Sequence, residues 1–598
     1  MLTQSERLDD LSISGLRQLY LRKSLSPSDL IDEIHRRIAR TRDYNIWIHV
    51  LDRRALTPYL ENLAAQDPES LPLYGIPFAI KDNIDLAGEP TTAGCPAFEY
   101  RAEHSSTVVA KLIGLGAIPI GKTNLDQFAT GLVGTRSPYG PCKNSFDPSY
   151  IAGGSSSGSA VAVALGQASF ALGTDTAGSG RVPAAFNNLI GYKPTRGLLS
   201  TAGVVPACKT LDCVNLFTLS VEDTQHLAEL IVEYDPLDDY SREQPVSASK
   251  ACTSFNFGVP QQEQLRFFGN DDAATLFQKA VERFEQMGGH KQILDCSPLF
   301  EAAQLLYQGP WLAERYAALA DIIEQNPEAL HPLTRSIIEP AARLTAVDAF
   351  NAFYRLQALK RQADALLNPV DFMLTPTAGT IYTIDQITQN PIELNSNLGY
   401  YTNFMNLLDF AALALPSGFD SNGLPNGITL FSRTFEDSLL MAYGKRYMEL
   451  SAINTGAPTC HAQAVIEIAV CGAHLSGLPL NHQLTDRGAK RLARTQTAPR
   501  YRLFALTGSS LGRPGLVRDE TYGAAIEIEV WSLPIDRFGS FVAAIPHPLG
   551  MGKIETAGGS WVAGFICEAY VIQDAEEITA FGGWRSYCGA QGGADNTE

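Results

Sequence analysis

The sequence lacks the features that would place it in a membrane or on a nucleic acid. No apolar run reaches the roughly 18 residues that a membrane-spanning helix needs. The N-terminal residues MLTQSERLDD lack the basic and apolar regions of a secretion signal. Positive charge is also scarce, because 46 lysines and arginines face 64 aspartates and glutamates, for a net charge of −18. We therefore expect a cytoplasmic protein with no nucleic-acid or membrane partner.

The cysteines and histidines are too scattered to form a metal site. The two cysteines closest in sequence, Cys208 and Cys213, have no second pair and no nearby histidines that would complete a zinc site. Free thiols in a reducing cytoplasm are the simplest account of them. We therefore expect no metal and no cofactor.

The chain has 598 residues, of which 45% are hydrophobic, and this is enough for more than one hydrophobic core. From 73 to 230, short apolar strands alternate with helical runs. This alternation predicts an α/β fold with a mixed sheet flanked by helices. Residues 270–370 are predicted to be mostly helical, with helices at 273–287, 300–326 and 346–367.

The pattern of the sequence changes near residue 455, where a helix ends and 456–463 has the composition of a linker. We therefore expect a first domain over 1–455 and a smaller domain over 464–598. The second is predicted to be β-rich, of the α+β class, and its polar end, 589–598, is predicted to be disordered. Its expected strands are 501–506, 523–532, 541–545 and 564–572.

A glycine-rich stretch from Gly153 to Pro183 carries two candidate nucleophile-type serines, Ser155 and Ser179. Upstream, an apolar strand-like run ends at Lys81. A serine hydroxyl needs a neighbouring base to become a nucleophile, and a lysine can be that base only if burial lowers its pKa. The set indicates an amide-cleaving hydrolase that uses no histidine. The alternative is a glycine/serine loop that caps a helix, with Lys81 an ordinary surface residue.

The turn that carries Ser179 also offers a place for negative charge. Successive backbone N–H groups, such as those of this turn, can bind the oxyanion of a tetrahedral intermediate. The candidate oxyanion hole consists of Thr176, Ala177, Gly178 and Ser179.

Three segments, GIPFAIKDNID, GGSSSGSA and GTDTAGSGRVPAAFNNLIGYKPTRG, resemble the amidase signature family. The resemblance covers most of residues 1–450 and implies the amidase-signature fold. It also implies that Ser179 is the nucleophile, that Ser155 relays the proton beside a cis non-proline peptide bond, and that Lys81 is the base. The sequence departs from many members at Ser157 and Ala177, and neither change alters a catalytic side chain.

Two further features bear on the substrate. The first is a helical segment with Tyr307 and Arg315, since a guanidinium can bind a carboxylate through two parallel hydrogen bonds. An arginine in a helix is, however, usually solvated or salt-bridged. The second is the C-terminal domain, which most amidases of this family lack. Both resemble the allophanate hydrolase branch of the family, in which such a tyrosine and arginine hold the carboxylate of the substrate.

This resemblance implies a reaction in two stages. Ser179 would attack the terminal carboxamide of allophanate (urea-1-carboxylate), ammonia would leave, and water would release N-carboxycarbamate. The C-terminal domain would then promote decarboxylation, so that the net products are ammonia and carbon dioxide. The candidate residues there are His474 as proton donor and Arg513 and Arg518 as carboxylate-binding groups. A lone histidine is more often structural.

Other functions remain open on the sequence. The chain could be a general or biuret-type carboxamide amidase whose C-terminal domain only binds or dimerises, or it could resemble the glutaminase subunit of tRNA amidation. The resemblance implies a homodimer. A urea carboxylase or a biuret hydrolase is the expected functional partner, and the sequence does not decide between these two sources of allophanate.

Overall fold

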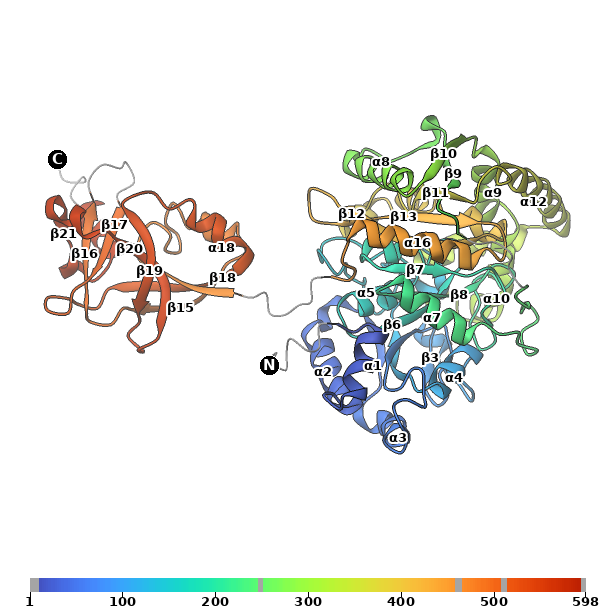
Figure 1. Cartoon of the computed structure of the whole chain (residues 1–598), viewed down its shortest axis with the longest axis horizontal. Helices are drawn as coiled ribbons and strands as arrows, with labels where there is room; N and C mark the ends of the chain where they lie inside the picture. The colour runs from blue at the N-terminus through green and yellow to red at the C-terminus, as the bar shows by residue number, and fades with distance from the viewer. Residues whose placement is uncertain (1–9, 246–250, 458–464, 507–512, 593–598) are drawn as a thin grey trace. The chain divides into compact units, whose positions relative to one another are not determined.

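The computed structural model describes residues 10–245, 251–457, 465–506 and 513–592 (Figure 1). The chain divides into two compact units, 1–459 and 460–598. Most of the predicted linker, 456–463, lies outside the described residues, as does 593–598 in the predicted disordered tail. The helices of the described ranges include none that is long and apolar enough to cross a bilayer.

The first unit is built on a mixed sheet of eleven strands, as the alternation of strands and helices predicted. Strand β2 is parallel to both of its neighbours, β5 and β6, whereas β6 and β8 are antiparallel. In order across the sheet, the strands are β1 (Trp47–Val50), β5 (Ile118–Thr123), β2 (Pro77–Lys81), β6 (Phe170–Asp175), β8 (Cys213–Thr218), β7 (Ile190–Lys193), β12 (Ala411–Phe419), β13 (Pro425–Ser432), β11 (Phe372–Pro376), β9 (Phe255–Pro260) and β10 (Gly289–Leu294). A separate ribbon pairs β3 (Pro90–Thr91) with β4 (Tyr100–Arg101).

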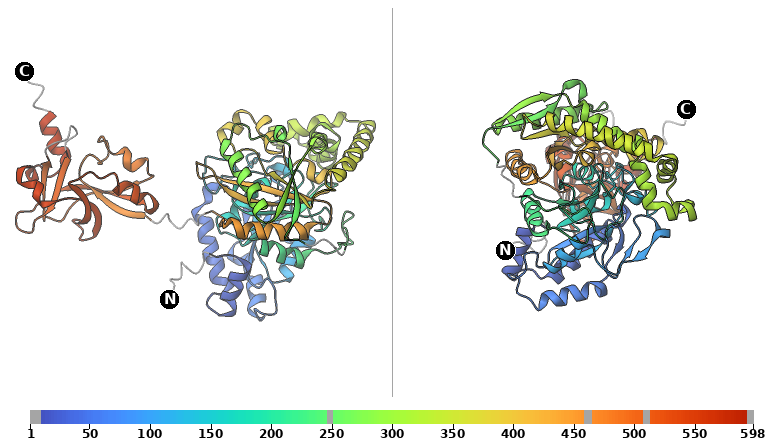
Figure 2. Two further views of the ribbon diagram at one scale, coloured as in Figure 1. Left: turned by 45° about the horizontal axis from the view of Figure 1, so that its top comes forward. Right: turned by 90° about the vertical axis from the view of Figure 1, so that its right-hand side faces the viewer.

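Helices surround this sheet, as both views of Figure 2 show. They are α1 (Ile13–Leu21), α2 (Pro27–Arg40), α3 (Arg53–Ala64), α4 (Thr107–Gly114), α5 (Ser157–Ala164), α6 (Val182–Phe186), α7 (Val221–Ile231), α8 (Asp271–Gln286), α9 (Ser297–Gln308), α10 (Trp311–Gln325), α11 (Pro332–Ile338), α12 (Ala346–Leu366), α13 (Ile384–Gln389), α14 (Glu393–Leu398), α15 (Phe404–Leu407) and α16 (Asp437–Ser451). The predicted helix at 300–326 is in fact two helices, α9 and α10. The break falls at Gly309 and Pro310, because proline lacks the N–H that a continuous helix would need.

Large and small side chains alternate along three strands of the sheet, and this alternation decides what each face can hold. The large side chains join the main core on one face: Phe78, Ile80, Phe170, Leu172, Leu413 and Leu415. The residues between them join a separate cluster with α5: Ala79, Ala171 and Ala414. Because alanines line this second face, the small-residue helix α5 can approach the sheet closely. That approach brings the glycine- and serine-rich loop before α5 to the ends of β2 and β6.

The second unit is β-rich, as predicted, and has its own core, which includes Ile468, Leu503 and Ile528. A five-stranded sheet has the order β15 (Lys490–Gln496), β18 (Glu527–Pro534), β14 (Val465–Val470), β20 (Trp561–Cys567) and β19 (Leu549–Glu555). A second sheet contains β17 (Arg513–Arg518), β16 (Tyr501–Leu506) and β21 (Glu576–Glu577). The helices are α17 (His482–Thr485), α18 (Ile535–Val542) and α19 (Trp584–Gly592).

One strand prediction in this unit is wrong. Residues 541–545 were expected to form a strand, but α18 ends at Val542 and a turn follows. The apolar residues Ile535, Phe538 and Phe541 recur every three positions, which is the spacing of a helix face.

Candidate active site

The catalytic candidates of the first unit lie at the carboxyl ends of two adjacent parallel strands. Lys81 is the last residue of β2, and Asp175 is the last residue of β6. In the register of this pair, Ile80 lies opposite Leu172, so that Lys81 lies beside the residues that precede Asp175. Side chains at the carboxyl ends of parallel strands meet at one edge of a sheet, where α/β proteins commonly bind their ligands.

Lys81 is fully buried and lies between two strands and the loop before α5. Its Nζ is 2.7 Å from Ser155 Oγ, 2.8 Å from Thr174 Oγ1 and 3.3 Å from Thr174 O. Burial lowers the pKa of Lys81 to about 7, although the carboxylates of Asp126, Asp212 and Asp175 act in the opposite direction. The lysine is therefore not an ordinary surface residue, and its ammonium form is easily deprotonated near neutral pH.

Ser155 lies in the loop between Gly153 and α5, and the peptide bond between Gly154 and Ser155 is cis, as the resemblance implied. The Ser155 carbonyl accepts a hydrogen bond of 3.2 Å from the backbone N–H of Asp126. A Cβ on Gly154 would lie only 2.1 Å from Asp126 Oδ2, so this position requires glycine. The loop is therefore held against Asp126 at two points.

Ser179 follows a turn that is held by the carboxylate of Asp175. This carboxylate accepts hydrogen bonds from Gly178 N at 2.8 Å and from Gly180 N at 2.9 Å, and it forms a buried ion pair with Arg181. Burial alone would raise the pKa of Asp175, but the charge and hydrogen bonds of Arg181 hold it below its usual range. Among the described residues, the Ser179 hydroxyl has no hydrogen-bond partner. The turn is rigid, and its hydroxyl is left available.

The same turn shows which N–H groups remain for an oxyanion. The N–H of Gly178 already donates to Asp175. Within the part of the chain that the structure describes, the N–H groups of Thr176, Ala177 and Ser179 have no acceptor. The candidate oxyanion hole therefore rests on these three groups, with Gly178 serving the turn itself.

The two substrate-binding candidates come from α9 and α10. Arg315, in α10, is only 2% exposed, and its Nη1 donates to Thr130 Oγ1 at 3.0 Å. Its Nε has no partner, and no carboxylate of the described residues lies within ion-pair distance of it. Its positive charge also lowers the pKa of Lys81. Tyr307 packs in the same apolar cluster as Ala177 of the oxyanion turn.

The structure adds residues that sequence reasoning missed. Thr174 supplies two of the three contacts of Lys81, and Asp126 binds three backbone N–H groups of the following loop, those of Val133, Gly134 and Arg136. Asp212 accepts a hydrogen bond from Thr176 Oγ1. A carboxylate that binds backbone groups has no periodic sequence pattern, so no signal pointed to Asp126 or Asp212.

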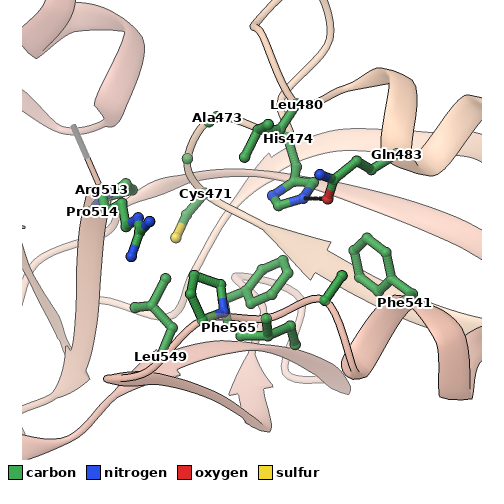
Figure 3. Close-up of a pocket in the computed structure, with 14 residues that line it drawn as sticks. Cys471, Ala473, His474, Leu480, Gln483, Arg513, Pro514, Phe541, Leu549 and Phe565 are labelled. Atoms are coloured by element: carbon green, nitrogen blue, oxygen red, sulfur yellow. Dashed lines mark hydrogen bonds between the residues drawn. The ribbon is translucent and has the colours of Figure 1, made fainter. Parts of the chain in front are cut away.

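The second unit contains a cavity of about 360 Å³, which Figure 3 shows in close-up. His474 and Arg513 both line it, together with an apolar wall that includes Phe541 and Phe565. His474 Nε2 is 3.0 Å from Gln483 Oε1, and its ring stacks on Phe565 with centroids 5.1 Å apart. Burial lowers the pKa of His474.

Because an amide oxygen only accepts hydrogen bonds, the contact with Gln483 places the proton of the neutral His474 ring on Nε2. Nδ1 then carries the lone pair, and a proton could be donated from Nδ1 only after His474 had been protonated. No sequence signal singled out Gln483.

The third candidate of this unit, Arg518, does not line the cavity. Its guanidinium lies 2.9 Å from carboxylate oxygens of both Glu520 and Glu555, and it also lies over the ring of Trp561. These contacts give Arg518 a structural role in its own sheet. The structure therefore brings together His474 and Arg513 but not Arg518.

Comparison with known proteins gives one family profile for each unit. The profile described as Amidase matches residues 29–441. The profile described as Allophanate hydrolase C-terminal domain matches residues 466–589.

Individual relatives agree with these profiles. The urea amidolyase of Saccharomyces cerevisiae is 43% identical over 570 residues; the match takes in 91% of this chain but only 31% of that protein. The solved structure of Kluyveromyces lactis allophanate hydrolase is 39% identical with a TM-score of 0.71, and covers 98% of this chain and 100% of that one. One subunit of the glutamyl-tRNA(Gln) amidotransferase of Methylacidiphilum infernorum is 30% identical over 477 residues, which are 74% of this chain and 95% of the relative.

Proposed function

The chain belongs to the amidase family, and from that premise we propose that it hydrolyses the terminal carboxamide of allophanate through an acyl-enzyme on Ser179. The whole-length similarity to an allophanate hydrolase supports this substrate. The match to the C-terminal profile further separates the chain from the amidotransferase relative, which resembles only 74% of it. The observation that carries the proposal is the buried Arg315 guanidinium, which has no carboxylate partner among the described residues.

In the first step, the proton of Ser179 passes to Ser155 and from there to Lys81. A neutral lysine amine has two N–H groups and one lone pair. The two N–H groups suit the two oxygens of Thr174, and the lone pair suits the Ser155 hydroxyl at 2.7 Å. The pKa of Lys81 near 7 supports the neutral form at working pH. Ser179 Oγ then attacks the carboxamide carbon.

The attack places negative charge on the former carbonyl oxygen, and the free N–H groups of Thr176, Ala177 and Ser179 are the donors that would bind it. When this intermediate collapses, the carbon–nitrogen bond breaks, and the relay returns its proton to the leaving nitrogen, which departs as ammonia. A water molecule then attacks the ester, with the same relay accepting its proton, and releases N-carboxycarbamate from Ser179.

Specificity comes from the far end of the substrate. Allophanate carries a carboxylate, and Arg315 would bind it, with the Tyr307 hydroxyl as a further donor. Burying an arginine without an acidic partner is costly. An anionic substrate offsets that cost, whereas a neutral amide does not.

The cavity with His474 and Arg513 is the proposed site of the second stage. There, protonation of the central nitrogen of N-carboxycarbamate would break a carbon–nitrogen bond and release carbon dioxide and carbamate. Carbamate then breaks down to ammonia and carbon dioxide. Arg513 would hold one carboxylate, while the apolar wall would favour loss of the other as uncharged carbon dioxide.

A urea carboxylase is the proposed source of allophanate. The chain spans 31% of the yeast urea amidolyase, so that relative contains much sequence that this chain lacks. The proposal also includes a homodimer in the cytoplasm, and it leaves biuret hydrolysis as a second possible source of allophanate.

The experiment that tests this proposal compares allophanate with biuret, in which a neutral carboxamide replaces the carboxylate. Arg315→Ala should lower kcat/KM for allophanate by several tens to several thousands of times, because a buried charged pair is typically worth about 2–5 kcal/mol. The value for biuret should change little. Equal losses for the two substrates would make Arg315 structural, and allophanate would no longer be the favoured substrate.

A further inference from the structure

A second arginine is buried near Arg315, and its environment is equally unusual. Arg136 is 2% exposed, and no carboxylate of the described residues lies within ion-pair distance of its guanidinium. Its Nη1 donates to Thr130 O at 3.1 Å and its Nη2 to Pro391 O at 2.8 Å, while Nε has no partner. Carbonyl oxygens therefore hold this side chain in one position, but they do not neutralise its charge.

Arg136 and Arg315 are linked through a single residue, Thr130. Arg136 binds the carbonyl of Thr130, and Arg315 binds its hydroxyl at 3.0 Å. The two arginines also act on each other electrostatically. Burial lowers the pKa of Arg136, and the charge of Arg315 lowers it further, whereas Asp126 and Tyr307 raise it. Two positive charges therefore lie close together, next to the tyrosine expected to bind the carboxylate.

The other end of this segment is tied to the catalytic serines. The backbone N–H of Arg136 donates to Asp126 Oδ1 at 2.9 Å, and Asp126 Oδ2 accepts from Val133 N at 3.1 Å and from Gly134 N at 2.9 Å. The N–H of Asp126 in turn donates to the Ser155 carbonyl. One short segment, 126–136, therefore connects Ser155 to Arg315.

We propose that Arg136 is a specificity-determining positioning residue of the amidase site, which orients Arg315 through Thr130 and adds a second buried positive charge where the substrate carboxylate binds. This inference rests on the proposed function. The segment 126–136 then sets the distance between the reacting carboxamide and the bound carboxylate. A neutral substrate such as biuret gains nothing from the second charge.

The test uses two substitutions at Thr130 that leave the carbonyl, and hence its bond to Arg136, in place. Thr130→Val removes the hydroxyl that binds Arg315, whereas Thr130→Ser keeps it and serves as the matched control. Thr130→Val should raise KM for allophanate about tenfold or more, the usual effect of losing a hydrogen bond to a charged group, with a smaller change in kcat. Thr130→Ser should restore KM, and biuret turnover should respond much less to either change.

Arg136→Gln tests the charge itself in the full-length protein. The ratio of kcat/KM for allophanate to that for biuret should fall by about tenfold or more, and Arg136→Lys should recover part of it. If Arg136→Gln does not fold, the Thr130 pair decides alone.

The reference is Arg315→Ala. If Arg315→Ala keeps the preference for allophanate, the proposed function fails and this inference fails with it. If Arg315→Ala loses the preference while Thr130→Val or a folded Arg136→Gln keeps it, only the role of Arg136 is overturned.

Discussion

At the scale of single residues, the chemistry depends on how Lys81 is buried. Three aspartates, Asp126, Asp212 and Asp175, raise its pKa, and burial lowers it by more, so that the balance lies at about 7. None of the three is in direct contact with Lys81, whose hydrogen bonds go to Ser155 and Thr174. A carboxylate in contact would hold the ammonium form and remove the base.

This balance predicts the pH dependence of ammonia release. Only the deprotonated amine accepts a proton, so kcat/KM should rise with pH through about 7 and then level off. Below that value it should fall about tenfold per pH unit. A profile that is flat from pH 5 to 9 would show that Lys81 does not titrate during catalysis.

Lys81→Arg should be inactive in the same assay, since a guanidinium keeps its proton near neutral pH. The Lys81→Arg and Ser155→Ala losses should not add when combined, because the relay acts as a unit. Near-normal activity of Lys81→Arg would contradict the assignment of Lys81 as the base.

The sequence allowed prediction of residues that react but not of residues that position them. Lys81, Ser155 and Ser179 were recognisable because reactive side chains and glycines recur at family spacings. Asp126 and Arg136 act through backbone groups that are adjacent only after folding. Arg518 illustrates the opposite error, since its charge suggested a carboxylate site but its carboxylate partners belong to the protein itself.

At the scale of elements, the site depends on the close approach of α5 to the sheet. Ala171 in β6 belongs to the cluster with α5, whereas its neighbour Leu172 faces the main core. The loop that carries Ser155 leads directly into α5, which begins at Ser157. Any displacement of α5 therefore moves Ser155 relative to Lys81.

Ala171→Leu should destabilise the first unit by about 1–3 kcal/mol, because overpacking forces side chains and backbone to shift. It should also lower ammonia release by displacing α5. Leu172→Met is the matched control on the opposite face, and because it nearly conserves volume it should cost less than about 1.5 kcal/mol. Urea unfolding and an activity assay measure both effects. Equal effects of the two substitutions would show that the alanine face does not control the position of α5.

Elements with strong patterns were predictable, and elements near breaks were not. The Ser26 cap correctly indicated the start of α2, and its side chain accepts a hydrogen bond from Asp29 N. The predicted strand at 541–545 failed because a short apolar run does not distinguish strand from helix. The predicted helix at 300–326 failed because periodicity continued across Gly309 and Pro310.

At the scale of the whole molecule, the two units suggest a division of labour. Gly456 N donates to Asn188 O and Ala457 N donates to Ala164 O, so the first unit includes both residues. A chain that ends after Ala457 therefore keeps every described contact of the amidase site. It lacks the cavity with His474 and Arg513.

The most direct test of the account follows carbon-13-labelled allophanate by NMR with simultaneous measurement of ammonia. Full-length protein should consume allophanate and release ammonia and carbon dioxide, and Ser179→Ala should do neither. The chain ending after Ala457, and full-length His474→Ala, should release the first ammonia promptly while N-carboxycarbamate persists. If the full-length protein did not consume allophanate, or if Ser179→Ala consumed it as fast, the proposed reaction would be wrong. If all active forms released carbon dioxide at one rate, the second unit would be a binding or dimerisation module.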